Sequence, residues 1–192
     1  MRYRVLDQNG LNFFTFTIVD WIDLFTRPVY MDMLIDSLSY CQKNKGLDIF
    51  GYVIMPSHIH LIAQTLSSEG ISKVIQNFKS YTASQILKHV KNKKSPESRR
   101  DWLLHHFAFH AQKNRTHSRY QVWQRDNHPI VLFTPKVIRQ KLAYIHFNPV
   151  KSKIVSQPEH YVYSSASNYI DGTGVLSVSV LDDIWNDIGL VS

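Results

Sequence analysis

Two histidines, His58 and His60, flank a single isoleucine inside the apolar run 51–64. Successive side chains of a β-strand point to opposite faces, so both imidazoles would emerge on one face and Ile59 on the other. Two neighbouring imidazoles can hold a metal ion, although an isolated His-x-His is more often only a pair of satisfied polar groups on a half-buried strand. The stretch Met55-Pro-Ser57 separates two strand-like runs, which puts the histidines at the start of a strand after a tight turn.

A tyrosine and an asparagine, Tyr144 and Asn148, are four residues apart near the end of a predicted helix. This spacing places them on one face of the helix, one turn from each other. A helical tyrosine taken alone is most often a partly buried packing residue with its hydroxyl at the surface. A phenol that loses its proton can instead act as a nucleophile.

Both motifs resemble those of one family. The stretch Met55-Pro-Ser-His-Ile-His-Leu61 resembles the HUH motif (His, hydrophobic residue, His) of single-tyrosine transposases, in particular the REP-associated tyrosine transposases. The stretch Tyr144-Ile-His-Phe-Asn-Pro-Val150 is similar to the tyrosine helix of the same family, and the two follow in the family's order. The resemblance extends along most of the chain, from Phe13 to Tyr169.

The resemblance implies roles for four residues. Tyr144 would be the catalytic nucleophile, and His58, His60 and Asn148 would be the ligands of Mg²⁺ or Mn²⁺. The wider group usually has glutamine at the last of these positions, whereas this chain has asparagine, which is one methylene shorter.

The function that follows from the resemblance is a DNA transposase. Such an enzyme would cut and rejoin single-stranded, hairpin-forming DNA through a 5′-phosphotyrosine intermediate and a free 3′-OH. Two alternatives stay open: a non-catalytic module that binds single-stranded nucleic acid on the same fold, and a metal-dependent nuclease that uses water. The sequence does not specify which DNA sequence or hairpin is recognised. It also leaves undecided whether the tyrosine acts within its own subunit or across a homodimer, and whether the protein still carries out transposition.

Composition agrees with a nucleic-acid partner. The 192 residues suit one domain with extensions, and 22 Lys+Arg against 15 Asp+Glu give a net charge of +7, which favours a polyanion. The single cysteine, Cys41, excludes an intrachain disulfide and fits a reducing compartment. No apolar run is long enough to span a bilayer and no secretory leader is evident, so we expect a cytoplasmic protein without membrane contact.

The order of predicted elements indicates an α+β fold. Strand, helix, strand, strand, helix is the start of a ferredoxin-like or RRM-like antiparallel sheet with helices packed on one face, in agreement with the HUH endonuclease fold. Apolar periodicity and turn signals predict strands at 12–19, 48–54 and 59–65, and helices at 28–45, 70–91, 101–113 and 134–149, the last ended by Pro149. The segment 120–130 is predicted to start as a short strand and then to turn through Asp-Asn-His-Pro at 126–129. We expect a transposase domain over 1–170 with a helical, basic insertion at about 92–118, and an extension over 171–192.

The basic run 88–100 contains Lys91, Lys93 and Lys94. It is either a solvated loop or a rim that contacts DNA phosphates. The resemblance also places Arg125 and His128 near DNA, against the alternative of an ordinary polar turn.

Two other patterns, a histidine pair in a predicted helix and an alternation in the C-terminal tail, have no role in the predicted chemistry. His106 and His110 would share one helix face, but no acid or third ligand is near in the sequence, so aromatic packing is favoured over a second metal site. Alternation of valine and serine through Val175, Ser177 and Ser179 predicts an edge strand of unknown role in the C-terminal tail.

Overall fold

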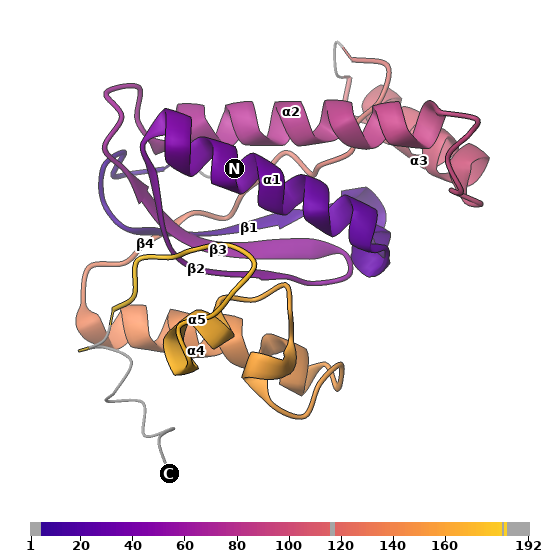
Figure 1. The fold of residues 1–192 in the computed structure, drawn as a ribbon. Helices are drawn as coiled ribbons and strands as arrows, with labels where there is room; N and C mark the ends of the chain where they lie inside the picture. Colours follow the sequence, from indigo (N-terminus) through magenta and orange to yellow (C-terminus); the bar gives the residue numbers. More distant parts are fainter. Residues whose placement is uncertain (1–4, 116–117, 182, 184–192) are drawn as a thin grey trace.

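A four-stranded antiparallel sheet with the order β2-β3-β1-β4 forms the centre of the molecule (Figure 1). The computed structural model describes residues 5–115, 118–181 and 183. The strands are β1 (Asn12–Thr17), β2 (Leu47–Ile54), β3 (His58–Thr65) and β4 (Ile130–Val131). With one helix after β1 and another after β3, the chain follows the β-α-β-β-α-β order of ferredoxin-like folds, which confirms the predicted fold class.

The helices begin and end close to the predicted positions. They are α1 (Pro28–Lys45), α2 (Ile71–Lys91), α3 (Arg100–Lys113), α4 (Pro135–Lys151) and α5 (Ala166–Ile170), with short 3₁₀ turns η1 (Val19–Trp21), η2 (Leu24–Thr26) and η3 (Pro158–His160). The predicted caps are present: Gly46 ends α1 in the left-handed conformation, and the Thr134 hydroxyl accepts a hydrogen bond from the Val137 amide at the start of α4.

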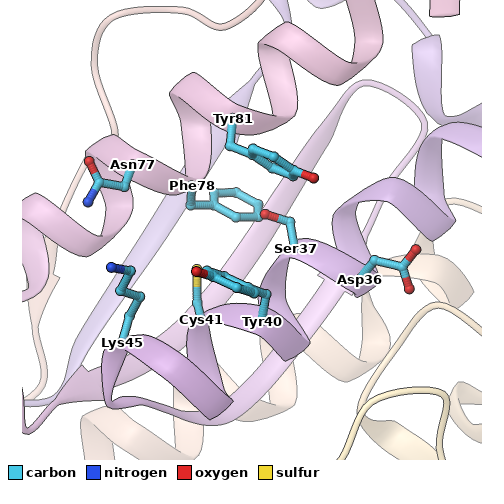
Figure 2. A pocket seen from close by; sticks show the side chains of 8 residues that line it. All are labelled: Asp36, Ser37, Tyr40, Cys41, Lys45, Asn77, Phe78 and Tyr81. Atoms are coloured by element: carbon cyan, nitrogen blue, oxygen red, sulfur yellow. The ribbon is translucent and has the colours of Figure 1, made fainter.

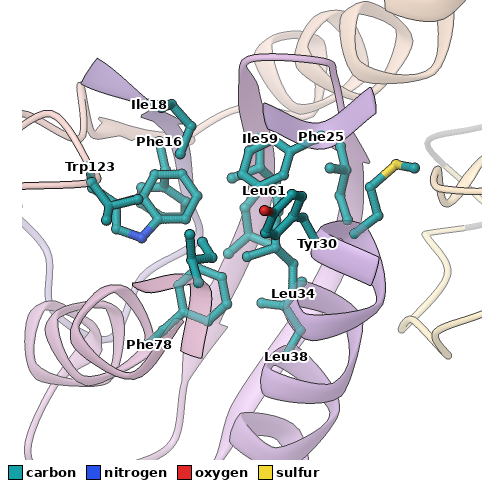
Figure 3. Close-up of a cluster of buried hydrophobic side chains, with 14 of the residues drawn as sticks. Phe16, Ile18, Phe25, Tyr30, Leu34, Leu38, Ile59, Leu61, Phe78 and Trp123 are labelled. Atoms are coloured by element: carbon teal, nitrogen blue, oxygen red, sulfur yellow. The ribbon is translucent and has the colours of Figure 1, made fainter. Parts of the chain in front are cut away.

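Helices cover both faces of the sheet, so the prediction of helices on one face is wrong. α1 and α2 lie on one face, and α4 and α5 lie on the other (Figure 1). The α1/α2 face holds the larger core, in which Phe16 of β1, Leu61 of β3 and Phe78 of α2 are fully buried (Figure 3). The α4 face has a smaller apolar cluster because the alternate strand positions, Phe13 and Ile62 among them, are also apolar.

A glycine lets α4 approach the sheet closely. Gly51 lies at an irregularity in the β2–β3 pairing, and a Cβ atom built there would come within 2.9 Å of Leu142 Cδ1 on α4. Leu142 and Ile145 are fully buried against this part of the sheet. The packing fixes the height and rotation of α4, and therefore the position of the side chains on its sheet-facing side.

The end of α4 and the strand after α3 differ from their predictions. Pro149 lies inside α4 instead of stopping it, but only two residues of the helix follow, so it lies in the last turn, where few hydrogen bonds are affected. The short strand predicted to begin at residue 120 is reduced to a single bridge between Trp123 and Ile18, although Gln124 and Asn127 still hydrogen-bond along the outer edge of β1. The left-handed backbone at His128 breaks the regular pairing before β4.

The predicted edge strand in the tail is also wrong. Ser179 donates a backbone hydrogen bond to Ile49 of β2, but residues 175–179 form no strand. The segment around Ser164 already pairs with Val53 at the edge of β2, so only one end of that strand is accessible to the tail.

The basic run 88–100 is more structured than a solvated loop. Glu97 is buried, accepts a hydrogen bond from Tyr30 of α1 at 2.7 Å and pairs with Arg27 and Arg99. These cations and hydrogen bonds outweigh burial and lower the pKa of Glu97 to about 2. Lys91, Lys93 and Lys94 remain exposed at the end of α2 and in the turn that follows.

No helix in the described part of the chain is long and apolar enough to cross a membrane.

Candidate active site

His58 and His60 lie on the face of β3 that α4 covers. The β1–β3 register places Thr17 opposite His58 and Thr15 opposite His60, so all four side chains share that face. The two imidazole rings are close, with centroids 4.7 Å apart in an edge-to-face arrangement. The predicted alternation is confirmed, since Ile59 points into the core on the α1/α2 face.

Each imidazole is held through its Nδ1 atom. His60 Nδ1 lies 2.9 Å from the Thr15 hydroxyl, and His58 Nδ1 lies 3.2 Å from the Ser57 hydroxyl. A hydroxyl that accepts from Nδ1–H fixes the tautomer in which Nε2 carries the lone pair. Both rings can therefore present Nε2 to a ligand or to an ion.

Tyr144 of α4 reaches these histidines within the same chain. Its hydroxyl lies 3.4 Å from His60 Nε2, and the two rings are 5.1 Å apart edge to face. Phe13 stacks on His60 at 5.3 Å and also meets the Tyr144 ring. The tyrosine keeps 40% of its surface exposed, so one side contacts the histidine and the other faces solvent.

Burial keeps both imidazoles neutral. It lowers the pKa of His60 to about 3, and the neighbouring charges of His58 and Lys141 act in the same direction. Burial also lowers the pKa of His58, although the Asp23 carboxylate partly opposes the shift. Because only a neutral imidazole can ligate a metal, the site would be ready to bind one at neutral pH.

His60 is not the exposed strand residue that a polar strand face suggests. It is only 4% exposed because Phe13 and the Tyr144 helix cover it, whereas His58 is half-buried. Replacing His60 would therefore disturb packing as well as chemistry.

Asn148 lies one turn beyond Tyr144 on α4 and is half-buried. Within the described residues, no hydrogen bond joins its side chain to either histidine. Its backbone carbonyl accepts from the Ser152 amide near the end of α4. Its assignment as a third ligand remains a prediction.

The other predicted DNA-binding residues lie away from the tyrosine. Lys91 ends α2 with its Nζ atom 4.4 Å above the Tyr120 ring, and Lys93 and Lys94 follow in the next turn. Arg125 donates to the Asn114 carbonyl oxygen, and His128 is exposed in the segment beside β1. The three lysines lie at the end of α2 and in the turn after it, whereas Arg125 and His128 lie in the segment that follows the outer edge of β1.

Sequence reasoning missed several residues that build the site. Thr15 and Phe13 contact His60 from β1, and Lys141 of α4 places its Nζ atom 4.7 Å from the Phe13 ring and 5.7 Å from the Tyr144 ring. Lys141 and Lys151 also line a shallow hollow of about 300 Å³ beside Tyr144. The alternation of Thr15 with the apolar residues of β1 indicates that Thr15 faces away from the main core. The sequence does not indicate that the pairing of β1 with β3 places Thr15 opposite His60.

The histidines of α3 have an acidic partner after all. Asp20 Oδ2 lies 2.7 Å from His110 Nε2 and 3.1 Å from His106 Nδ1, so an acid that is distant in the sequence meets both histidines in the fold. Hydrogen-bonding interaction with His110, and then with His106, lowers the pKa of Asp20. Both ring nitrogens contact the carboxylate directly, and no group of three or more His, Cys, Asp or Glu among residues 5–115, 118–181 and 183 could hold a metal ion.

A separate groove lies between α1 and α2, on the opposite face of the sheet from Tyr144. It has a volume of about 550 Å³, and Tyr40, Phe78 and Tyr81 contribute much of its wall (Figure 2). Tyr40 and Tyr81 are more than half exposed, whereas Cys41 at its base is buried. The groove is mainly apolar and carries none of the predicted catalytic residues.

Comparisons with known proteins identify the family and the fold of the chain. The sequence model described as "Transposase IS200 like" matches residues 22–123, more than half of the chain. A solved structure of a REP-associated tyrosine transposase bound to a REP hairpin has a similar fold, with a TM-score of 0.62 and 17% identity over 93% of this chain and 91% of that one.

A second structure, of a candidate transposase from Deinococcus radiodurans, has a TM-score of 0.44 and 15% identity over 76% of this chain and 98% of that one. No curated protein matches the sequence. On the strength of the sequence match over residues 22–123, the chain belongs to the IS200-like transposase family.

Proposed function

We propose that this protein cleaves and rejoins single-stranded DNA with Tyr144 as its nucleophile. The observation that carries the proposal is the 3.4 Å separation of the Tyr144 hydroxyl from His60 Nε2, in a chain of the IS200-like transposase family. A phenol oxygen beside two neutral imidazoles is arranged for attack on a phosphate bound between them.

The implied cofactor is Mg²⁺ or Mn²⁺, held by His58, His60 and Asn148. The histidines fit this role because both are neutral and both turn Nδ1 toward a hydroxyl of Ser57 or Thr15. Asn148 would add an amide oxygen, the kind of ligand that hard cations prefer. When bound, the ion would supply Lewis-acid polarisation of the phosphate.

The residues of the chain account for the remaining chemistry. Tyr144 Oη forms a bond to phosphorus while the bond from phosphorus to the 3′ oxygen breaks, which gives a 5′-phosphotyrosine and a free 3′-OH. Lys141 Nζ lies 5.7 Å from the centre of the Tyr144 ring, where its positive charge would attract the incoming phosphate. The covalent bond conserves the energy of the phosphodiester, so attack by a 3′-OH rejoins the strand without a nucleotide cofactor.

The substrate we propose is single-stranded DNA that forms hairpins, by analogy with the hairpin-bound structure of similar fold. Exposed Lys91, Lys93, Lys94, Arg125 and His128 would contact phosphates along the edge of β1 and α2. Because Tyr144 contacts the histidine of its own chain, cleavage would not require a homodimer. We assign the catalytic unit to residues 1–170, with 171–192 as an extension.

The test uses single-stranded hairpin oligonucleotides labelled at the 5′ or the 3′ end. After incubation with Mg²⁺, Mn²⁺ or EDTA, the products are separated on a denaturing gel. A 5′-phosphotyrosine link predicts that the 3′ label alone migrates with the protein, only with metal, and that Tyr144→Phe gives neither adduct nor cleavage.

The alternatives give different results. A water-using nuclease would cut both labelled strands without labelling the protein, and it would tolerate Tyr144→Phe. A binding module would shift the DNA on a native gel but leave it intact. Either pattern would contradict the proposed function.

A further inference from the structure

A hollow of about 380 Å³ lies beside the histidines, and Trp21 lines it. Trp21 is 59% exposed, unusual for such a large apolar side chain. Its ring also meets the His58 ring edge to face, with the centroids 5.5 Å apart. The same side chain therefore borders both the candidate active site and the neighbouring hollow.

The backbone that carries Trp21 is held in an unusual conformation. Asp20 and Trp21 have φ angles of 55° and 54°, in the left-handed region that residues other than glycine rarely adopt. The contacts of the Asp20 carboxylate with His106 and His110 tie this turn to α3. Such strain persists only where neighbouring contacts over-determine the backbone, so the ring of Trp21 is pre-positioned.

Amide side chains form much of the remaining wall. Asn114 donates to Gln121 Oε1 at 2.9 Å, and Gln121 donates to the Trp123 carbonyl oxygen at 2.9 Å. Gln124 donates weakly to the Ile18 carbonyl oxygen at 3.4 Å. In the part of the chain that the structure describes, no hydrogen bond uses the side-chain oxygens of Asn114 and Gln124, so both can accept from a ligand.

The charges around the hollow favour a neutral polar ligand over a phosphate. Lys113 and Arg125 bring two positive charges to its lining, and Asp20 and Asp126 bring two negative ones. Two carboxylates would repel a phosphate placed among them. A nucleobase, by contrast, has a flat apolar face and an edge of hydrogen-bond donors and acceptors, which match an exposed indole and fixed amides.

We propose that this hollow binds one unpaired base of the single-stranded DNA, next to the phosphate that Tyr144 attacks. Trp21 would stack on the base, and Gln124 and Asn114 would accept hydrogen bonds from its edge. The inference rests on the proposed function, and it adds a specificity-determining site that the histidines and the tyrosine do not supply.

The experiment measures DNA binding in a Tyr144→Phe background, where cleavage cannot obscure affinity. This protein selects binders from a random single-stranded DNA pool that contains a fixed hairpin. The same selection is repeated with Trp21→Leu, Gln124→Leu and a control, Tyr40→Leu, which removes an equally exposed aromatic ring from the α1/α2 groove. Circular dichroism and thermal melting check the fold of each variant.

Four results are expected. The background protein and Tyr40→Leu should enrich the same base at one fixed position. Trp21→Leu should weaken binding about 5- to 100-fold, the range for removal of one base–aromatic stack, while Trp21→Phe restores most of the affinity. Gln124→Leu should change or relax the preference at that position. A 2-aminopurine at that position should be quenched by the background protein and not by Trp21→Leu.

Opposite results would overturn the inference. The base subsite is excluded if Trp21→Leu and Gln124→Leu both keep the affinity and the base preference of the background protein. That outcome alongside a normal Tyr144 adduct in the parent protein would leave the proposed function intact. If the background protein bound no DNA in the pool, both proposals would fail together.

Discussion

The two faces of the sheet use the same strands for different purposes. Phe14 and Phe16 of β1, and Ile18 directly after it, point toward α1 and α2 and are completely buried in an apolar core. The alternate residues, Phe13 and Thr15 among them, point toward α4, where an apolar patch adjoins a polar one. One face is closed by packing alone, whereas the other is closed only in part and keeps hydroxyls, imidazoles and a phenol together.

The difference shows how this fold separates stability from chemistry. α4 is anchored on the sheet by Leu142 and Ile145, close to Gly51. On the same turn of this helix, Tyr144 lies over His60. A turn whose apolar side chains are packed tightly against the sheet can present a reactive side chain beside them with little movement, because close-packed cores yield little.

The largest expected effect concerns the imidazoles of the α4 face. His58→Ala should reduce metal-dependent cleavage by about a thousandfold or more, because removal of a ligand takes away several kcal/mol of transition-state stabilisation. Cleavage rates in Mg²⁺ and Mn²⁺ measure this, with circular dichroism as the control for folding. His60→Ala should have the same effect together with some loss of stability, because His60 is buried. Full activity of either variant would contradict the metal assignment.

Two phenylalanines of β1 allow the faces to be compared directly. Phe16→Ala, on the α1/α2 face, should lower the free energy of unfolding by about 3 to 5 kcal/mol and leave adduct formation by the folded protein nearly unchanged. Phe13→Leu should cost about 1 to 2 kcal/mol, yet slow adduct formation, because Phe13 stacks on His60. Urea denaturation and single-turnover assays provide the two measurements. If the two variants were alike in both, the faces would not be functionally distinct.

A smaller effect is expected from the hydroxyl behind His60. Thr15→Val keeps the shape of the side chain but removes the partner of His60 Nδ1, so metal affinity should fall about 10- to 100-fold. Isothermal titration with Mn²⁺ measures the change. Thr17→Val is the matched control, since Thr17 lies two residues further along the same face and makes no side-chain hydrogen bond within the described structure. Equal losses in both variants would argue against a specific role for Thr15.

The smallest effect should come from the basic turn. Neutralising Lys91, Lys93 and Lys94 to glutamine should weaken single-stranded DNA binding. The slope of log affinity against log salt should fall by about 0.7 for each DNA phosphate that a lysine no longer neutralises. A matched change of Lys43, Lys45 and Lys73, near α1 and the start of α2, should leave the slope almost unchanged. An equal change in both triple variants would mean that net charge, rather than this turn, attracts DNA.

Much of the site could be predicted because it depends on local spacing. The shared face of His58 and His60 follows from strand alternation, and the helix that carries Tyr144 is marked by Thr134 and Pro135. The ferredoxin-like order of strands and helices could also be predicted, because each element has its own local pattern of apolar residues and turn signals.

What could not be predicted depends on contacts between distant segments. Thr15 reaches His60 only through the pairing of β1 with β3, and Asp20 meets His110 across 90 positions of the chain. The burial of Glu97 was not predicted, because it lies in a run of charged residues and such runs are usually exposed to solvent. The spatial positions of these side chains depend on contacts between distant segments, and such contacts cannot be inferred from a single sequence.

The proposed nucleophile is the tyrosine held against the histidines of the α4 face. Mass spectrometry of the protein–DNA adduct, after nuclease and protease digestion, identifies the residue that carries the DNA. We expect a nucleotide on Tyr144 alone, with no adduct in Tyr144→Phe and a normal one in Tyr81→Phe, whose ring lies in the α1/α2 groove. A nucleotide found on Tyr81, or an adduct that persists in Tyr144→Phe, would contradict it.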